Sequence, residues 1–217
     1  MKLYGYWRSS AAYRVRIALY LKNIAFEDIS VHLVKGGGEQ HNASYQRLNP
    51  NELVPTLIDE DLVLHQSLAI IDYLEQLPSA KDGLNSFYPE PAKERAKVQA
   101  FSLDIACEIH PLNNLRVQQY LSQKMACNDT NKSQWINHWI SIGFKAIEQQ
   151  LTQTAGQYCF GDKVTLADIC LIPQVYNAKR FKVDMTNYPY INKVVENCLI
   201  LPAFIKALPE NQKDATL

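Results

Sequence analysis

Residues 2–33 read KLYGYWRSSAAYRVRIALYLKNIAFEDISVHL, and this stretch decides the fold of the first part of the chain. Residues 2–6 have the composition of a strand, and the apolar residues after them have helical spacing. Those apolar residues are Ala11, Ala12, Val15, Ala18 and Leu19. Residues 26–33 return to a strand pattern. A strand, a helix and a second strand in this order predict a parallel β-α-β unit.

The next segment completes a small sheet. Residues 56–58 and 62–64 flank the acidic run Asp59-Glu60-Asp61, and this arrangement predicts a hairpin of two antiparallel strands. A helix is expected to follow over residues 67–77. Before the hairpin, residues 35–39 read KGGGE, and so many glycines predict a mobile loop. We therefore expect a mixed sheet of four strands in an α/β domain.

The pattern changes after the first eighty residues. Residues 77–91 contain Pro78, Gly83, Pro89 and Pro91, which is the composition of a linker. Helices are expected after it near residues 92–122, 133–152, 166–180 and 190–199. We therefore expect two domains, an α/β domain over residues 1–80 and an all-helical domain over residues 88–217.

One helix start is marked clearly. Thr165 precedes an apolar helical run, and Asp168 stands three residues later. In a capping box, the first side chain accepts from a backbone amide of the first turn while the acidic side chain reaches back. This pair predicts the start of the helix over residues 166–180.

Composition excludes several classes of protein. Lys plus Arg is 22 and Asp plus Glu is 22, so the formal net charge is zero. No basic run is present to attract nucleic acid. No apolar stretch approaches the roughly 20 residues of a membrane span. The first residues lack the apolar core of a signal peptide, so we expect a cytoplasmic protein.

The cysteines argue against two kinds of cross-link. The chain has five of them, with no Cys-x-x-Cys pair. An odd number at scattered positions does not suggest a disulfide framework or a structural zinc site, and we predict no metal ligands. Most of these cysteines are expected to be small buried residues. They are Cys107, Cys127, Cys159, Cys170 and Cys198.

Several segments resemble a known family over nearly the whole chain. They are YWRSSAAYRVRIAL at 6–19, LVPTL at 53–57, HQSLAI at 65–70, HPLNNL at 110–115, GDKVTLAD at 161–168 and NAKRFKV at 177–183. The sequence resembles the zeta class of glutathione transferases, which includes maleylacetoacetate isomerases. The first segment is specific to that class, whereas the second and third are common to many glutathione transferases. The resemblance implies a thioredoxin-like first domain, an all-helical second domain, a homodimer and glutathione as cofactor.

The resemblance assigns catalysis to the start of the first helix, where Ser9 and Ser10 stand. A serine before a helix can direct its hydroxyl and the free amides of the first turn toward an anion such as a thiolate. One serine of the pair could instead be only the helix cap, and Ser10 is the stronger candidate for that role. Thioredoxins have Cys-x-x-Cys at this turn, whereas this chain has Ser9-Ser10-Ala11-Ala12. Disulfide exchange by the protein itself is therefore excluded at this position. Some zeta members have a cysteine where this chain has Ala11.

Other residues match the family's glutathione site. Val54 and Pro55 match a cis-prolyl turn whose backbone pairs with the tripeptide, although a plain turn proline is the alternative. Gln66 and Ser67 stand at the start of a helix, where the free backbone amides favour a carboxylate. Ser67 could instead serve only as the helix cap. Gln40 matches a position that contacts the glycyl end of glutathione.

In the second domain, His110 and Asn114 match positions that line the active site. His110 precedes a proline and could equally serve packing or capping. Arg180 is the expected anchor for a substrate carboxylate, because a guanidinium can hold a carboxylate through two hydrogen bonds. Arg8 and Arg116 are further candidates for substrate binding, although Arg116 could be an ordinary exposed helix residue.

The activity implied by the resemblance is glutathione-dependent conversion of maleylacetoacetate to fumarylacetoacetate in the breakdown of tyrosine and phenylalanine. The thiolate would add to the double bond, allow rotation and then leave, so that glutathione is regenerated. Two alternatives share this site: isomerisation of maleylpyruvate, and conjugation or dehalogenation of small α-halo acids. A third alternative is a noncatalytic binding module, because a fold alone does not prove activity.

Overall fold

The computed structural model describes residues 1–77 and 86–216. Four strands form one sheet: β1 (Lys2–Gly5), β2 (Glu27–Ser30), β3 (Thr56–Asp59) and β4 (Leu62–His65). Their order in the sheet is β2-β1-β3-β4. Strand β1 pairs in parallel with β2 and antiparallel with β3, while β3 and β4 form the hairpin. The predicted mixed sheet and its parallel first unit are therefore confirmed.

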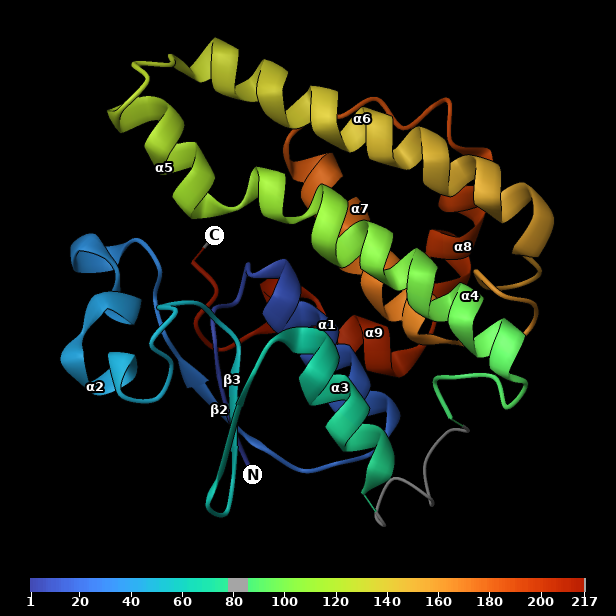
Figure 1. The fold of residues 1–217 in the computed structure, drawn as a ribbon, viewed down its shortest axis with the longest axis horizontal. Coiled ribbons are helices and arrows are strands. Elements are labelled where there is room, and N and C mark those ends of the chain that lie inside the picture. Colours follow the sequence, from blue (N-terminus) through green and yellow to red (C-terminus); the bar gives the residue numbers. More distant parts are fainter. Residues whose placement is uncertain (78–85, 217) are drawn as a thin grey trace. The chain divides into compact units, whose positions relative to one another are not determined.

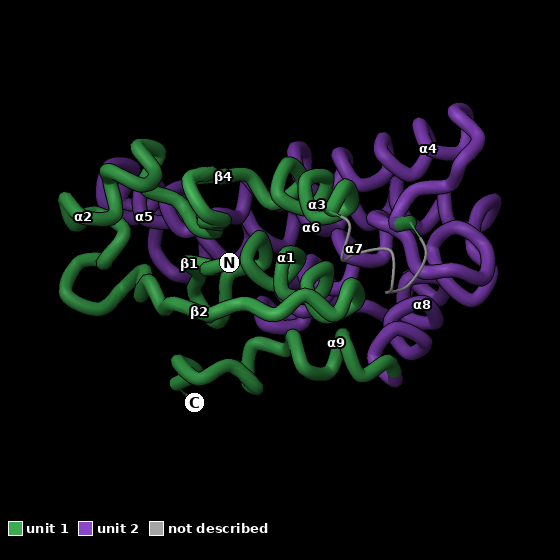
Figure 2. The backbone as a smooth tube through the Cα atoms, turned by 90° about the horizontal axis from the view of Figure 1, so that it is seen from below, with its two compact units in different colours: residues 1–86, 201–217 green, residues 87–200 purple. Residues whose placement is uncertain are grey.

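Helices lie on both sides of this sheet. Helix α1 (Ser10–Leu21) packs against α3 (Ser67–Gln76) on one side, and the short helix α2 (Ala43–Gln46) lies on the other (Figures 1 and 2). Of the five apolar residues that predicted α1, Ala12, Val15, Ala18 and Leu19 are fully buried, and Ala11 is half-buried. Arg14 and Arg16 of the same helix are also almost completely buried.

The glycine-rich segment has more structure than its composition suggested. Residues Lys35–Gly37 and Glu39–His41 form single 3₁₀ turns, so the expectation of an irregular loop is wrong in part. Gly36, Gly37 and Gly38 all have positive φ, which glycine adopts without strain. A Cβ atom on Gly38 would lie 2.5 Å from Nε2 of Gln40, so another residue there would displace the Gln40 side chain and would also be strained at a φ of 108°.

The second half is helical, as expected, but its first long helix is broken. Helix α4 (Ala92–Leu103) continues into a π-helical turn, Asp104–Ile109, and a 3₁₀ turn, Pro111–Asn113, before α5 (Leu115–Gln123) begins. The prediction of one helix over residues 92–122 is therefore wrong. Pro111 has no N–H to continue the ladder of hydrogen bonds, and Asn114 caps a new helix by accepting from the Arg116 amide.

The remaining helices follow the sequence more closely. They are α6 (Asp129–Thr154), α7 (Leu166–Arg180) and α8 (Pro189–Leu199). Helix α7 starts and ends where the sequence predicted, and the capping box of Thr165 and Asp168 is present. Residues Leu166 to Val175 of this helix are all buried, so α7 forms the centre of the second core.

The structure divides into two compact units, coloured separately in Figure 2. Unit 2 comprises Phe87–Ile200, and unit 1 combines the residues before it with those from Leu201 onward. The expected second domain of residues 88–217 therefore differs from unit 2 at its C-terminal end. The cause is helix α9 (Pro202–Ala207), which the sequence did not predict: it packs on α1 and buries Phe204 completely. Of the predicted linker, residues 78–85 lie outside the described part.

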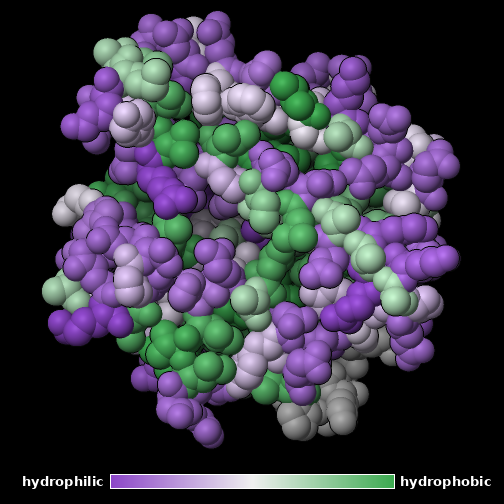
Figure 3. All heavy atoms as spheres, in the orientation of Figure 1, coloured by the Kyte–Doolittle hydropathy of each residue, from purple (hydrophilic) through white to green (hydrophobic). Residues whose placement is uncertain are grey.

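The face shown in Figure 3 is largely hydrophilic, with smaller hydrophobic areas between the polar side chains. Among the described residues, no helix is long and apolar enough to cross a membrane.

Candidate active site

Ser9 caps helix α1. Its backbone has extended geometry, and its Oγ accepts a hydrogen bond from the Ala12 amide at 3.2 Å. Ser10 is the first helical residue and is buried. The stronger cap candidate from sequence was Ser10, and that assignment is wrong, because the helix begins one residue after Ser9. Capping uses only the hydroxyl oxygen of Ser9, so its hydrogen can still be donated to an anion.

Ser67 begins helix α3 and contacts α1. The residue before it, Gln66, is exposed, has a φ of 72° and makes no side-chain cap, so Ser67 is the first helical residue and not the cap. The Ser67 hydroxyl is buried and accepts a hydrogen bond from Nη1 of Arg14 at 3.3 Å. A helix start without a side-chain cap presents backbone amides and a partial positive charge, which suit a carboxylate.

The turn before β3 contains the predicted cis peptide bond, between Val54 and Pro55. The carbonyl of the preceding Leu53 accepts hydrogen bonds from the Tyr45 hydroxyl at 2.6 Å and from the side-chain Nδ2 of Asn49 at 2.8 Å. Val54 itself is half-buried, and Pro55 is buried.

Gln40 has one polar atom left over. Its side chain is 5% exposed, and its Nε2 donates to the Leu33 carbonyl at 3.4 Å and contacts Nε2 of His41 at 2.9 Å. Its Oε1 is buried and has no hydrogen-bond partner among the described residues. A buried carbonyl oxygen without a partner costs free energy unless something donates to it. An N–H group of a bound peptide would supply that donor, so Gln40 fits a tripeptide cofactor.

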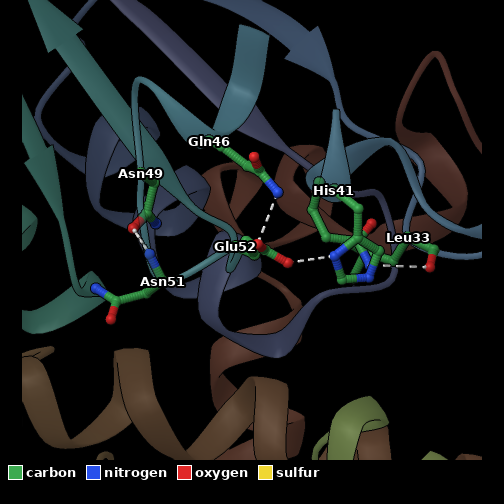
Figure 4. A network of polar contacts seen from close by, with 7 residues as sticks. Leu33, His41, Gln46, Asn49, Asn51 and Glu52 are labelled. Atoms are coloured by element: carbon green, nitrogen blue, oxygen red, sulfur yellow. Dashed lines mark hydrogen bonds and ion pairs between the residues drawn. The ribbon is translucent and has the colours of Figure 1, made fainter. Parts of the chain in front are cut away.

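A polar network holds the loop that carries Gln40 (Figure 4). Nδ1 of His41 forms a hydrogen bond with Oε2 of Glu52, and Nε2 of Gln46 donates to Oε1 of the same carboxylate at 2.8 Å. Next to it, the Asn51 amide donates to Oδ1 of Asn49 at 3.0 Å. Glu52 adopts a φ of 55°, so these contacts also hold a backbone conformation that non-glycine residues rarely take.

The predicted residues of the helical half all belong to unit 2. His110 is half-buried at the end of the π-helical turn, and its amide donates to the Ile105 carbonyl at 2.9 Å. Asn114 is the cap of α5, and Arg116 in the first turn of that helix is exposed.

The other two arginines stack on aromatic rings. Arg180 ends α7, is exposed, and has its guanidinium carbon 4.2 Å from the centre of the Phe181 ring. Arg8 belongs to unit 1, where its guanidinium carbon lies 5.1 Å from the centre of the Trp7 ring. Such stacking supports the flat guanidinium face, while its edge can still donate to a carboxylate.

The cysteines offer no activated thiol in the core. Cys159, Cys170 and Cys198 are buried, as expected for most of the five. Burial raises the pKa values of the Cys159 and Cys198 thiols, and the Asp168 carboxylate adds to both shifts. Both thiols therefore stay protonated and unreactive.

Three polar residues near the predicted site were not found from sequence. Arg14 contacts Ser67, Arg16 contacts the turn before Ser9, and Asp214 contacts the same turn from the C-terminal segment. For the arginines a signal existed, because two charged residues interrupt an otherwise apolar helix. For Asp214 there was none.

Comparisons with known proteins agree along the chain. Residues 3–82 match the model of the glutathione S-transferase N-terminal domain, and residues 114–207 match that of the C-terminal domain. A probable maleylacetoacetate isomerase of Vibrio cholerae is 53% identical, over 98% of this chain and 97% of its own.

Two solved structures are similar throughout. One is a holo maleylpyruvate isomerase, described as a bacterial zeta-class glutathione S-transferase, with 41% identity and a TM-score of 0.93 over 100% of both chains. The other is a maleylacetoacetate isomerase from Methylobacterium extorquens AM1 with bound malonate and glutathione, with 36% identity and a TM-score of 0.93 over 100% of both chains. With its mixed sheet, its helical second half and these matches, the chain belongs to the glutathione S-transferase family, within the zeta class.

Proposed function

We propose that this protein is a glutathione-dependent cis–trans isomerase that converts maleylacetoacetate to fumarylacetoacetate, in the breakdown of tyrosine and phenylalanine. The observation that carries the proposal is the start of α1. There, Ser9 keeps a hydroxyl hydrogen available, and the next three residues contain no thiol. A sulfur nucleophile at this place must therefore come from a cofactor, and relatives of this type are described with bound glutathione.

Glutathione, when bound, supplies the thiolate that adds reversibly to the conjugated double bond. In our proposal, Ser9 donates its hydroxyl hydrogen to that sulfur. Ser10, as the first residue of α1, contributes to the positive end of the helix dipole, which also stabilises the thiolate. The proposed ligands of the tripeptide are Gln40, Val54, Pro55, Gln66 and Ser67. Gln40 would accept an N–H at its unpaired Oε1, and the uncapped start of α3 would hold a carboxylate.

For the substrate we propose a small dicarboxylate. Arg180 remains the proposed anchor for one of its carboxylates, with Arg8 and Arg116 as further donors, because guanidinium groups bind carboxylates in two-pronged fashion. His110 and Asn114 remain proposed contacts of the bound molecules. A relative of this class is described with bound malonate and glutathione, which supports a site for dicarboxylates.

The test is an ultraviolet assay of purified protein with maleylacetoacetate, coupled to a fumarylacetoacetate hydrolase. We expect consumption of substrate only when glutathione is present. Glutathione binding without turnover of any cis-enedioate would instead favour a binding module. Turnover that is equally fast without glutathione would contradict the proposal.

A second candidate reaction is the isomerisation of maleylpyruvate. It is favoured by the similarity to the holo maleylpyruvate isomerase, which covers both chains completely. The ratio of kcat/KM for the two substrates, measured on one protein preparation, decides between them. A higher value for maleylpyruvate would replace the first assignment and leave the glutathione chemistry unchanged.

We further propose a cytoplasmic homodimer. All five cysteines are free thiols, which is typical of a reducing compartment. Light scattering coupled to gel filtration should give twice the chain mass of 24.8 kDa. A mass equal to one chain at micromolar concentration would exclude the dimer.

A further inference from the structure

Ser9 is placed by a tight turn. The Ser9 amide donates to the Tyr6 carbonyl at 2.9 Å, which closes a four-residue turn with Trp7 and Arg8 at its centre. The Ser9 carbonyl then accepts from the Tyr13 amide at 2.8 Å as the first bond of α1. The position of the Ser9 hydroxyl therefore depends on how firmly this turn is held.

Both backbone polar groups of Trp7 are held from outside the turn. Its N–H donates to Oδ2 of Asp214 at 3.1 Å, although the two residues are 207 positions apart in the sequence. Its carbonyl accepts from Nη2 of Arg16 at 2.9 Å. The same Asp214 oxygen accepts from the Ser30 hydroxyl at 2.8 Å, so this carboxylate joins the turn to the end of β2.

Arg16 connects the turn to the C-terminal segment a second time. Its Nε donates to the Ala207 carbonyl at 3.2 Å, in α9. The side chain is 1% exposed, and burial lowers its pKa while the charges of Asp28 and Asp214 act in the opposite direction. Arginine stays charged even so. A buried cation is costly unless hydrogen bonds and nearby opposite charges offset the loss of water. Here the hydrogen bonds come from carbonyls of the turn and of the C-terminal segment, and the charges of Asp28 and Asp214 favour the cation.

We propose that the C-terminal segment, residues 201–216, positions the turn of residues 6–9 that carries Ser9. The positioning residues are Asp214 of that segment and Arg16 of α1. This inference rests on the proposed function, because it assigns the segment a purpose through Ser9. Stabilising a thiolate requires a donor held at the right place before the reaction. A displaced turn would raise the pKa of the bound thiol and lower kcat, with little change in the affinity for glutathione.

The test compares Asp214→Ala and Asp214→Asn with Glu210→Gln as a matched control. Glu210 is an exposed acidic residue of the same segment. The pKa of the glutathione thiol bound to each protein is measured from the ultraviolet absorbance of the thiolate. We expect Asp214→Ala to raise this pKa and to lower kcat about tenfold. Asp214→Asn should have a smaller effect because its amide oxygen can still accept, and Glu210→Gln should match the wild type.

A second measurement separates this inference from the proposed function. Hydrogen exchange of the Trp7, Arg8 and Ser9 amides, measured without glutathione, should speed up in Asp214→Ala. If the wild-type protein does not bind glutathione, the proposed function fails, and the exchange rates alone decide whether the segment holds the turn. Unchanged exchange, or an unchanged thiol pKa in a variant that binds glutathione, would overturn the inference.

Folding is checked by circular dichroism and thermal melting. If Asp214→Ala does not fold, Ser30→Ala takes its place, because it removes one hydrogen bond of Asp214 from an exposed side chain without changing the turn. The expected changes then have the same direction and a smaller size, and wild-type values for Ser30→Ala would count against the proposal.

Discussion

Ser9 combines two roles in one hydroxyl group. Its oxygen accepts from the Ala12 amide and stabilises the start of α1. Its hydrogen is the donor that we propose for the thiolate. A substitution at this residue therefore affects stability and catalysis together, and the two effects must be measured separately.

We predict that Ser9→Ala lowers kcat at saturating glutathione by about 10²–10³, the usual cost of losing one donor to a developing anion. Loss of the cap should also cost about 1 kcal/mol in the free energy of unfolding, measured by urea denaturation. Ser9→Gly is the control for stability: it also lacks the hydroxyl, but glycine at a cap costs only a few tenths of a kcal/mol in the free energy of unfolding. Full turnover by Ser9→Ala would show that the hydroxyl has no catalytic role.

A different result is expected at Ser67, whose hydroxyl contacts the buried Arg14. Because the Ser67 oxygen accepts from Arg14, its hydroxyl hydrogen can donate to the carboxylate of glutathione that we propose to bind here. Hydrogen bonds to charged groups contribute about 1.5–3 kcal/mol, so Ser67→Ala should raise the KM for glutathione about tenfold or more. The value of kcat should change little, because binding of the cofactor is lost equally in the ground and transition states. Ser44→Ala, at an exposed serine of α2, is the control. An unchanged KM would remove Ser67 from the glutathione site.

At the scale of elements, the start of α7 depends on one carboxylate. Asp168 is fully buried, and its two oxygens accept from the Thr165 amide and the Cys159 amide, each at 2.8 Å. The first bond closes the capping box, and the second fixes the chain that precedes the helix. Asp168 thus connects a local signal to the core of unit 2.

We predict that Asp168→Asn destabilises the protein by about 1–3 kcal/mol, because an amide nitrogen cannot accept and one buried N–H loses its partner. The free energy of unfolding in urea measures this. The control is Asp184→Asn. Asp184 also accepts hydrogen bonds from a residue close in sequence, Thr186, but Asp184 is exposed. Its change should stay within about 0.5 kcal/mol. Equal losses in the two variants would contradict the importance of burial.

At the scale of the whole molecule, the half-buried carboxyl group of Asp28 makes stability depend on pH. Burial raises the pKa of Asp28, Asp214 raises it further, and Arg16 and Lys213 oppose the shift. In the folded protein Asp28 therefore binds a proton more strongly than in the unfolded chain. The contribution of Asp28 to the unfolding free energy must then fall as the pH rises from about 4, its ordinary value, through the raised pKa.

Asp28→Asn removes this contribution. The free energy of unfolding of the wild type and of the variant is measured by urea denaturation at a series of pH values. We predict that the wild-type value minus the variant value decreases as the pH rises through that window. A difference that stays constant or grows with pH would contradict the direction of the shift.

The sequence by itself determined several features that depend on near neighbours. The four strands with α1 and α3, the β3–β4 hairpin and the limits of α7 follow from periodicity, turn residues and caps within a few positions. The place of Ser9 and Ser10 at the start of α1 follows in the same way. The roles of the predicted site residues came from the resemblance to a family.

Only the tertiary structure decided the rest. It showed that Ser9 rather than Ser10 is the cap, that the helix after Ala92 breaks at the π-helical turn, and that α9 joins unit 1. It also brought Arg16 and Asp214 to the turn before Ser9. The physical reason is the length of chain between partners. Local patterns describe neighbours along the sequence, whereas the whole of unit 2 lies between Trp7 and Asp214 in the chain, so only the folded structure brings these two residues together.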